Sequence, residues 1–293
     1  MLWPKSLSKN IKTNVNLASL TSFKIGGPAE YFFEPKTLKE LQAALIFAKQ
    51  AGLRVFILGA GSNILVNQAG LTGLVIRLSN QNFKGCRCQS SCIVAGGGLK
   101  LNELILFSKK HNLGGLEFLA GIPGTLGGSL LGNAGAWGKS IGELVSQVGV
   151  LDFNGNLKHL TANDLKFTYR KSNLNKYIII WAKLKLKPAQ KKMIGVKIKE
   201  NLLQRKQAQG NNLPNAGCIF KNPGQGSAGR LIDLCGLKGM SRGKAMVSKR
   251  HANFILNTGN AKSQDVLSLM DLIQKKVKSR FKINLEPEIK IWK

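Results

Sequence analysis

Two segments carry side chains that could grip an acid and move a proton. Arg170 follows Tyr169 in a basic turn, and a guanidinium can hold a carboxylate through two parallel hydrogen bonds. Cys218 is a lone thiol between Gly217 and an apolar pair. A free thiol has a pKa of about 8.5, so near neutral pH it is protonated and can donate a proton. Each also has a simpler interpretation: Arg170 as part of a solvated turn, and Cys218 as a small buried hydrophobe.

A third segment, near the C-terminus, places two of the chain's 14 acidic residues around one proline. Pro287 fixes the backbone between Glu286 and Glu288. If a strand follows, Glu288 and Lys290 share one face of it. The segment is interpreted either as a functional carboxyl or as the salt-bridged start of a strand.

Two glycine-rich loops could bind an anion. The first runs from Gly59 to Asn63 between two predicted strands. Two glycines two positions apart allow a tight bend that presents backbone N–H groups to a phosphate, and Ser62 and Asn63 add side-chain donors. The second runs from Gly121 to Gly128 and continues to Gly135. Alone, the first loop is better explained as an ordinary tight turn, and the second could equally be a buried crossover between domains. Two of them flanking strands in one domain favour a dinucleotide, although neither is a GxGxxG fingerprint or a P-loop.

Metal and nucleic-acid sites have little support. Cys86, Cys88 and Cys92 lack a CxxC pair and have no histidine nearby, so no metal site is expected. Tyrosine and tryptophan are few and do not alternate with a basic patch, which argues against sequence-specific nucleic-acid recognition.

The composition describes a basic, folded protein. The 293 residues include 44 Lys and Arg and 14 Asp and Glu, a net charge of +30. A hydrophobic content of 43% excludes a disordered polybasic chain. The charge is consistent with an anionic substrate, nucleic acid, a membrane surface or plain compositional bias. The five cysteines are an odd number, and residues 1–20 lack an apolar segment, so neither a disulfide-stapled secreted scaffold nor a signal peptide is expected. Residues 118–138 are uncharged but rich in glycine, which favours buried loops over a membrane span.

Periodicity predicts the elements that must position these residues. Thr37 and Glu40 form a capping box for a helix that ends at Gly52. Asn154-Gly155 predicts a hairpin turn. Further helices are predicted at 101–112, 189–209 and 263–280, with a short one around Leu231. Strands are predicted at 54–58, 73–78, 92–95, 145–153, 177–186 and 254–255, and around Ile289.

From about Ser22 to Lys293 the chain resembles one family, the flavin-dependent UDP-N-acetylenolpyruvoylglucosamine reductases of peptidoglycan synthesis. No single motif is decisive, but their order and spacing together are specific. The segments that carry the resemblance are 22–27, 59–63, 122–128, 133–137, 169–172, 217–223, 227–229, 236–239, 251–254 and 285–289.

The resemblance implies an α+β fold with a two-subdomain FAD-binding domain of the vanillyl-alcohol-oxidase type and a C-terminal α/β substrate domain. The expected divisions are an extension at 1–20, an FAD domain at 21–190 (subdomains of about 21–80 and 81–190) and a substrate domain at 191–293. The implied FAD-binding residues are Gly59, Ala60, Gly61, Ser62, Asn63, Ile122, Pro123, Gly124, Thr125, Gly127, Gly128, Asn133 and Gly135.

The resemblance also implies the chemistry. NADPH reduces FAD, and the reduced flavin then converts the enolpyruvyl ether of UDP-N-acetylglucosamine-enolpyruvate to UDP-N-acetylmuramate. Arg170 would neutralise the substrate carboxylate. Glu288 would hydrogen-bond to that carboxylate, which implies a raised pKa. Cys218 stands where most members have a serine proton donor.

For the substrate, the resemblance implies a contact from Asn222. Tyr169 is also expected to contact the substrate, and Lys206 and the nearby Arg205 are candidates to meet its diphosphate. The connection between Arg170 and Cys218 is short, so a tyrosine-bearing loop found in some members is expected to be absent. A cytoplasmic monomer is expected, without membrane insertion or nucleic-acid binding. The alternatives are an FAD-dependent oxidase on the same scaffold and a basic nucleic-acid-binding module. The basic residues Lys238, Arg242, Lys244, Lys249 and Arg250 are expected either to steer anionic substrates or to reflect composition.

Overall fold

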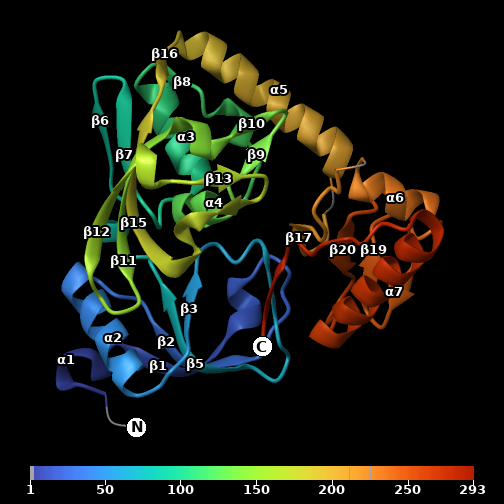
Figure 1. Cartoon of the computed structure of the whole chain (residues 1–293), viewed down its shortest axis with the longest axis horizontal. Coiled ribbons are helices and arrows are strands. Elements are labelled where there is room, and N and C mark those ends of the chain that lie inside the picture. The colour runs from blue at the N-terminus through green and yellow to red at the C-terminus, as the bar shows by residue number, and fades with distance from the viewer. Residues whose placement is uncertain (1–2, 211, 225) are drawn as a thin grey trace. The chain divides into compact units, whose positions relative to one another are not determined.

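The computed structural model describes residues 3–210, 212–224 and 226–293. The chain forms two compact units (Figure 1). Unit 1 comprises residues 1–13, 31–60 and 72–204, and unit 2 comprises residues 14–30, 61–71 and 205–293. Each unit has its own apolar core.

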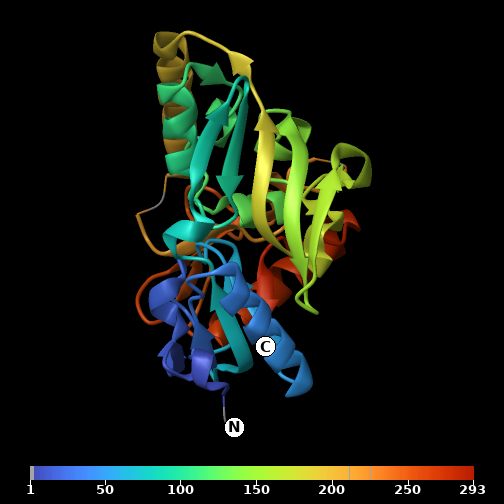
Figure 2. The same cartoon turned by 90° about the vertical axis from the view of Figure 1, so that its left-hand side faces the viewer.

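The main sheet of unit 1 has five strands that are antiparallel to their neighbours, seen side by side in Figure 2. Their order is β12 (Leu157–Thr161), β11 (Val145–Asp152), β15 (Tyr177–Lys185), β7 (Cys92–Gly96) and β6 (Cys86–Gln89). Apolar residues on this sheet form one core with α3 (Leu101–Lys110) and α4 (Leu126–Leu131). This burial stabilises the glycine-rich segment that leads into α4.

A four-stranded sheet has the order β1 (Ile11–Asn16), β2 (Pro28–Phe33), β5 (Leu71–Arg77) and β3 (Val55–Leu58). Helix α2 (Leu38–Gln50) begins after Thr37, whose side chain accepts a hydrogen bond from the Glu40 N–H at 3.2 Å. The buried face of α2 packs with residues of β5 and with the short helix α1 (Lys5–Ser8). The predicted capped helix is therefore confirmed.

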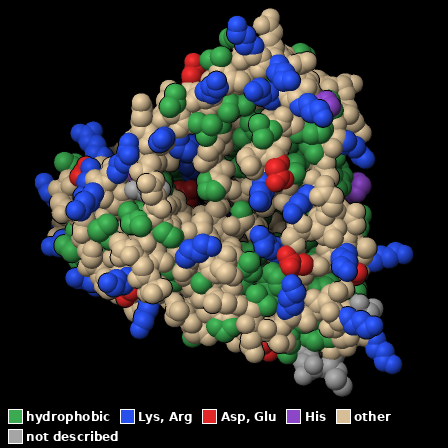
Figure 3. All heavy atoms as spheres, turned by 180° about the vertical axis from the view of Figure 1, so that it is seen from behind, with side chains coloured by type: hydrophobic (Ala, Val, Ile, Leu, Met, Phe, Trp, Pro, Cys, Tyr) green, Lys and Arg blue, Asp and Glu red, His purple; other side chains and the backbone are tan. Residues whose placement is uncertain are grey.

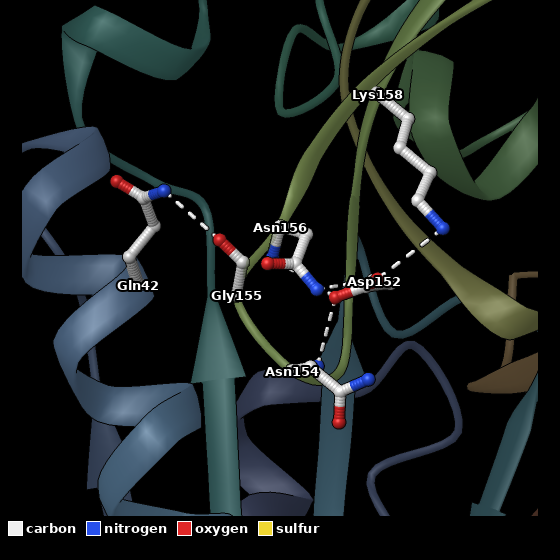
Figure 4. A network of polar contacts seen from close by, with 6 residues as sticks. All are labelled: Gln42, Asp152, Asn154, Gly155, Asn156 and Lys158. Atoms are coloured by element: carbon white, nitrogen blue, oxygen red, sulfur yellow. Dashed lines mark hydrogen bonds and ion pairs between the residues drawn. The ribbon is translucent and has the colours of Figure 1, made fainter.

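The hairpin between β11 and β12 is fastened by one carboxylate (Figure 4). Asp152 accepts hydrogen bonds from the backbone N–H groups of Asn154 and Asn156, both at 2.9 Å, and forms an ion pair with Lys158 at 3.4 Å. The Gln42 side chain of α2 donates to the Gly155 carbonyl at 2.9 Å. The predicted Asn154-Gly155 turn is confirmed, and it attaches the five-stranded sheet to α2.

Shorter elements complete unit 1. They are β8 (Leu113–Gly114), β9 (Gly135–Ala136), β10 (Lys139–Ser140), β13 (Phe167–Thr168), β14 (Lys171–Ser172) and β16 (Lys187–Pro188). The long helix α5 (Lys191–Gln209) buries Ile194, and its Asn201 side chain donates to the Glu117 carbonyl at 2.9 Å.

Unit 2 is built on a sheet in the order β17 (Asn215–Cys218), β20 (Phe254–Asn257), β19 (Ala245–Val247) and β18 (Ser241–Arg242). Helices α6 (Ala228–Leu234) and α7 (Ser263–Phe281) share its core, and the predicted apolar face of α7 is buried. The last strand, β21 (Lys290–Trp292), pairs in parallel with β4 (Ile64–Val66).

Two features differ from the patterns in the sequence. The glycine-rich stretch contains α4, because Thr125 caps its start and Leu126 and Leu130 are fully buried. The compact units also divide the chain differently from the expected domains, since residues 14–30 join the C-terminal part. Ser22 donates to the Asn215 carbonyl at 2.7 Å and Asn257 donates to the Phe23 carbonyl at 3.1 Å. None of the helices in the described ranges is long and apolar enough to cross a membrane.

Candidate functional site

The first glycine loop follows β3 and has the form of an anion cradle. Gly61 has φ +64°, and a Cβ there would lie 2.3 Å from the Leu20 carbonyl oxygen. Only glycine fits this position. Over the described part of the chain, neither Ala60 nor Gly61 donates its backbone N–H to another residue. Two adjacent unused donors at a sharp turn suit the pyrophosphate of FAD.

Within unit 1, the second glycine loop lies against Gly59, the first residue of the first loop. A Cβ at Gly59 would lie 2.8 Å from Thr125 Oγ1, so the missing side chain lets the two loops approach. The first three N–H groups of α4 are already used, by the carbonyls of Leu99 and Gly97 and by Thr125 Oγ1. The open backbone donors therefore lie in the first loop, and the second loop packs closely against Gly59.

The end of the second loop is tied to the predicted carboxylate-binding arginine. Asn133 is buried; its side chain donates to the Thr168 carbonyl and accepts from the Gly142 N–H, both at 3.0 Å. The Arg170 guanidinium donates to the Gly135 carbonyl at 3.2 Å. Residues expected to bind FAD and the arginine expected to bind substrate are thus joined in unit 1.

Arg170 occupies the tight turn between β13 and β14. Its φ is +54°, a left-handed conformation that a non-glycine residue rarely adopts. Its guanidinium carbon lies 5.7 Å from the centre of the Tyr169 ring, and Tyr169 is 57% exposed. The turn holds the cation beside an exposed aromatic ring.

In unit 2, one residue connects the predicted proton donor with the predicted carboxyl group. Cys218 ends β17 opposite Phe254 and is partly buried. The next residue, Ile219, accepts a hydrogen bond at its carbonyl from the Glu288 N–H at 2.8 Å. The thiol and the carboxyl group therefore belong to segments paired by their backbones, although 69 other residues separate them in the sequence.

Glu288 is also connected to the first glycine loop. The Asn63 side chain donates to the Glu288 carbonyl at 3.3 Å, and the Lys290 N–H donates to the Asn63 carbonyl at 3.0 Å. Asn63, which was expected to contact FAD, thus also holds the C-terminal segment.

The expected substrate-binding residues of unit 2 are exposed. Asn222 accepts a hydrogen bond from the Ala228 N–H at 3.0 Å and so supports the start of α6, and Lys206 lies on the exposed surface of α5. Lys238 pairs with Asp233 at 2.6 Å, and Arg250 donates to the Gln207 carbonyl at 3.1 Å. Lys and Arg side chains spread over the face in Figure 3 and do not form one patch.

His251 was given no role from the sequence, yet it has an unusual environment. Its Nδ1 is buried and has no hydrogen-bond partner among the described residues. The ring packs against Phe254 with 4.9 Å between ring centres. Burial lowers the pKa of His251, and the positive charge of Lys238 lowers it further. A hydrogen bond to the backbone of His251 itself acts in the opposite direction but is outweighed. The signal in the sequence was its position in the segment 251–254.

The structure gives the other cysteines no catalytic setting. Cys86 and Cys88 pack at the edge of the unit 1 core. Burial, with a smaller contribution from Cys88, raises the pKa of Cys86 to about 12. No cluster of three or more potential metal ligands occurs in the ranges that the structure describes.

Comparisons with known proteins agree with this arrangement. Residues 29–161 match the family model described as "FAD binding domain", and residues 207–292 match the one described as "UDP-N-acetylenolpyruvoylglucosamine reductase, C-terminal domain". The α+β fold class, with an FAD-binding domain followed by a C-terminal domain, is confirmed.

Relatives and a solved structure show the family. UDP-N-acetylenolpyruvoylglucosamine reductase 2 of Symbiobacterium thermophilum is 41% identical over 93% of this chain and 89% of its own. The reductase of Caldanaerobacter subterraneus is 42% identical over 92% of this chain and 90% of its own. The crystal structure of the reductase from Thermus caldophilus is 34% identical, with a TM-score of 0.83, and covers 97% of this chain and 99% of that one. The chain belongs to the UDP-N-acetylenolpyruvoylglucosamine reductase family.

Proposed function

We propose that this protein uses NADPH and FAD to reduce the enolpyruvyl ether of UDP-N-acetylglucosamine-enolpyruvate to UDP-N-acetylmuramate, a step of peptidoglycan synthesis. The supporting observation is the pairing of the Cys218 and Glu288 segments through Ile219, next to the Asn63 loop. An FAD-dependent oxidase has no need of a proton donor paired with a carboxyl group. The reductase needs both, because it adds hydrogen to a carbon–carbon double bond.

Bound FAD supplies the hydride, which it receives from NADPH and which adds to the terminal carbon of the vinyl group. The double bond is thereby broken, and negative charge develops at the carbon next to the carboxylate. Arg170 binds the substrate carboxylate and stabilises this charge. Glu288 hydrogen-bonds to the same carboxylate in its protonated form. The Cys218 Sγ donates a proton to the carbon, which completes the lactyl ether, and solvent reprotonates the thiolate.

The net reaction consumes one NADPH and one proton for each double bond. Tyr169, Asn222 and Lys206 are proposed to contact the substrate. The dispersed basic surface would raise the encounter rate of a nucleotide substrate and NADPH, both polyanions. A cytoplasmic location and a monomeric state are proposed with this function.

Anaerobic stopped-flow measurements on the FAD-loaded protein test the proposal. NADPH should bleach the flavin absorbance, and the enolpyruvyl nucleotide should restore it without oxygen. Reoxidation by air with no response to the nucleotide would instead identify an oxidase. Absence of any flavin absorbance after FAD loading would overturn both.

A further inference from the structure

The backbone after Cys218 is held by an unusual side chain. β17 pairs with β20 up to Cys218, opposite Phe254, and the Ile219 N–H then donates to the Asn253 carbonyl at 2.9 Å. Asn253 is only 2% exposed. It is therefore part of the interior of unit 2 rather than of its surface.

The Asn253 side chain makes two hydrogen bonds to one residue. Its Oδ1 accepts from the Phe220 N–H at 3.0 Å, and its Nδ2 donates to the Phe220 carbonyl at 2.8 Å. Phe220 is fully buried. Among side chains, a carboxamide can accept from an N–H and donate to a carbonyl at the same time. The Asn253 side chain thus makes the two backbone hydrogen bonds that a residue of a neighbouring strand would make.

The opposite edge of the same segment carries the Glu288 strand. The Glu288 N–H donates to the Ile219 carbonyl at 2.8 Å, and the Lys221 N–H donates to the Glu286 carbonyl at 2.9 Å. Phe220 lies directly opposite Pro287, which has no N–H. Residues 219–221 are therefore held on one edge by Asn253 and on the other by residues 286–288.

We propose that Asn253 is a positioning residue for the protonation step, which fixes the spacing between the Cys218 thiol and the Glu288 carboxyl group. This inference rests on the proposed function, which gives these two groups their roles. The Ile219–Phe220 backbone contains a direct route between them, because Ile219 follows Cys218 and its carbonyl accepts from the Glu288 N–H. Asn253 determines the position of that backbone because it binds three of its four polar groups, leaving the fourth, the Ile219 carbonyl, to the N–H groups of Glu288 and Ile289.

A purely structural role for Asn253 makes a different prediction, and the chain offers a matched control. Asn257 ends β20, the strand that begins directly after Asn253; it is 4% exposed and also uses its carboxamide inside unit 2. It donates to the Phe23 carbonyl at 3.1 Å and accepts from the N–H groups of Gly259 and Ala261 at 3.0 Å. Loss of either carboxamide leaves buried polar groups unpaired and destabilises the fold. Of these two carboxamides, that of Asn253 hydrogen-bonds to the 219–220 backbone and that of Asn257 does not.

The test compares Asn253→Leu, Asn253→Asp and Asn257→Leu in the FAD-loaded full chain, with anaerobic stopped-flow measurement of both half-reactions. Asn253→Leu should leave flavin reduction by NADPH near the parent rate and slow reoxidation by the enolpyruvyl nucleotide about 10- to 100-fold. Asn257→Leu should lower the melting temperature about as much as Asn253→Leu does, but it should change neither rate. Asn253→Asp keeps the acceptor for the Phe220 N–H and should fall between parent and leucine variant; it also serves if the leucine variant does not bind FAD.

A double-mutant cycle separates positioning from general damage. Cys218→Ala should slow reoxidation strongly in the parent and much less in the Asn253 variant, because the thiol is already misplaced there. Equal effects of Asn253→Leu and Asn257→Leu on reoxidation, or additive effects of the Asn253 and Cys218 substitutions, would overturn the inference. If the parent itself fails to respond to the nucleotide, the proposed function has failed instead.

Discussion

The Asn63 side chain donates a hydrogen bond to the backbone carbonyl of Glu288 at 3.3 Å. These residues are 225 positions apart, and they come from the first glycine loop and the C-terminal segment. Asn63, from the loop expected to hold the FAD pyrophosphate, and the backbone of Glu288, whose carboxyl group is expected to hold the substrate, are therefore adjacent within unit 2. A substitution of Asn63 should therefore shift the backbone of Glu288.

Asn63→Ala tests this connection. Loss of one hydrogen bond should cost about 1 kcal/mol of stability, and both FAD retention and flavin reoxidation by the nucleotide should weaken. The control is Asn82→Ala, which removes an exposed bond from Asn82 Nδ2 to the Lys36 carbonyl in unit 1 and should leave both properties unchanged. FAD titration and stopped-flow rates make the comparison. Normal FAD binding and reoxidation in Asn63→Ala would contradict the connection.

Cys218 is expected to be the proton donor. Cys218→Ala should leave flavin reduction by NADPH intact and slow reoxidation by the nucleotide about 10²- to 10⁴-fold, the usual contribution of a general acid. Cys218→Ser restores the hydroxyl that most family members carry and should retain substantial turnover. Anaerobic stopped-flow gives both rates. Parent-like reoxidation in Cys218→Ala would assign the proton to another group.

Gly61 is expected to be essential to the FAD cradle. In Gly61→Ala the new methyl group would meet the Leu20 carbonyl in a left-handed backbone, so the loop should shift at a cost of more than about 1 kcal/mol. The variant should lose FAD on gel filtration. Gly85→Ala is the control, because no heavy atom lies within 4 Å of its added Cβ. If Gly61→Ala retains FAD on gel filtration and has the stability of the parent, the first glycine loop is not the FAD-binding cradle.

Asp152 should make stability depend on pH. Burial acts to raise its pKa, but hydrogen bonds from Asn156 and Asn154 and the contact with Lys158 outweigh it, so the pKa lies below its usual value. The carboxylate therefore stabilises the fold above the unfolded-state pKa of about 3.9, and this contribution disappears as pH falls through the lower folded-state pKa.

Asp152→Asn should thus lower stability at pH 7 by less than about 1 kcal/mol, since its ion-pair partner Lys158 is 48% exposed and solvent screens the pair, and should approach the parent at acidic pH. Chemical denaturation at several pH values measures this. Asp271→Asn, which breaks an exposed pair with Lys275 within α7, is the control. A stability difference that grows toward acidic pH would have the wrong sign.

Cys86 should be chemically inert in the native protein. With a pKa of about 12, about one thiol in ten thousand is ionised at pH 8, and the thiolate is the reactive form. Iodoacetamide followed by peptide mapping should leave Cys86 unmodified in native protein and modify it in urea. Equal modification in both states would show that burial does not protect the thiol.

Local features of the sequence were sufficient to predict most of the helices and strands. The Thr37 cap and the Asn154-Gly155 turn depend on neighbouring residues, so α2 and the β11–β12 hairpin could be predicted. The helix α4 could not, because its glycines argue for a loop and its stability comes from the burial of Leu126 and Leu130 against distant strands.

The site was predictable in its residue types but not in its connections. Arg170, Cys218 and Glu288 were found from motif order, and their roles stay predictions. The bonds from Asn253 to Phe220 and from Asn63 to Glu288 are long-range, and asparagine at these positions has no periodic or compositional signal. Only the folded chain reveals which carboxamide binds which peptide.

Unit 2 is assembled from residues 14–30, 61–71 and 205–293, and its last strand, β21, pairs with β4. During synthesis, the first two of these stretches leave the ribosome long before their partners exist. Such distant pairings form slowly. The Asn63 turn therefore gains its supports from Glu288 and Lys290 only after these residues have been synthesised, and deletion of β21 should weaken the retention of FAD.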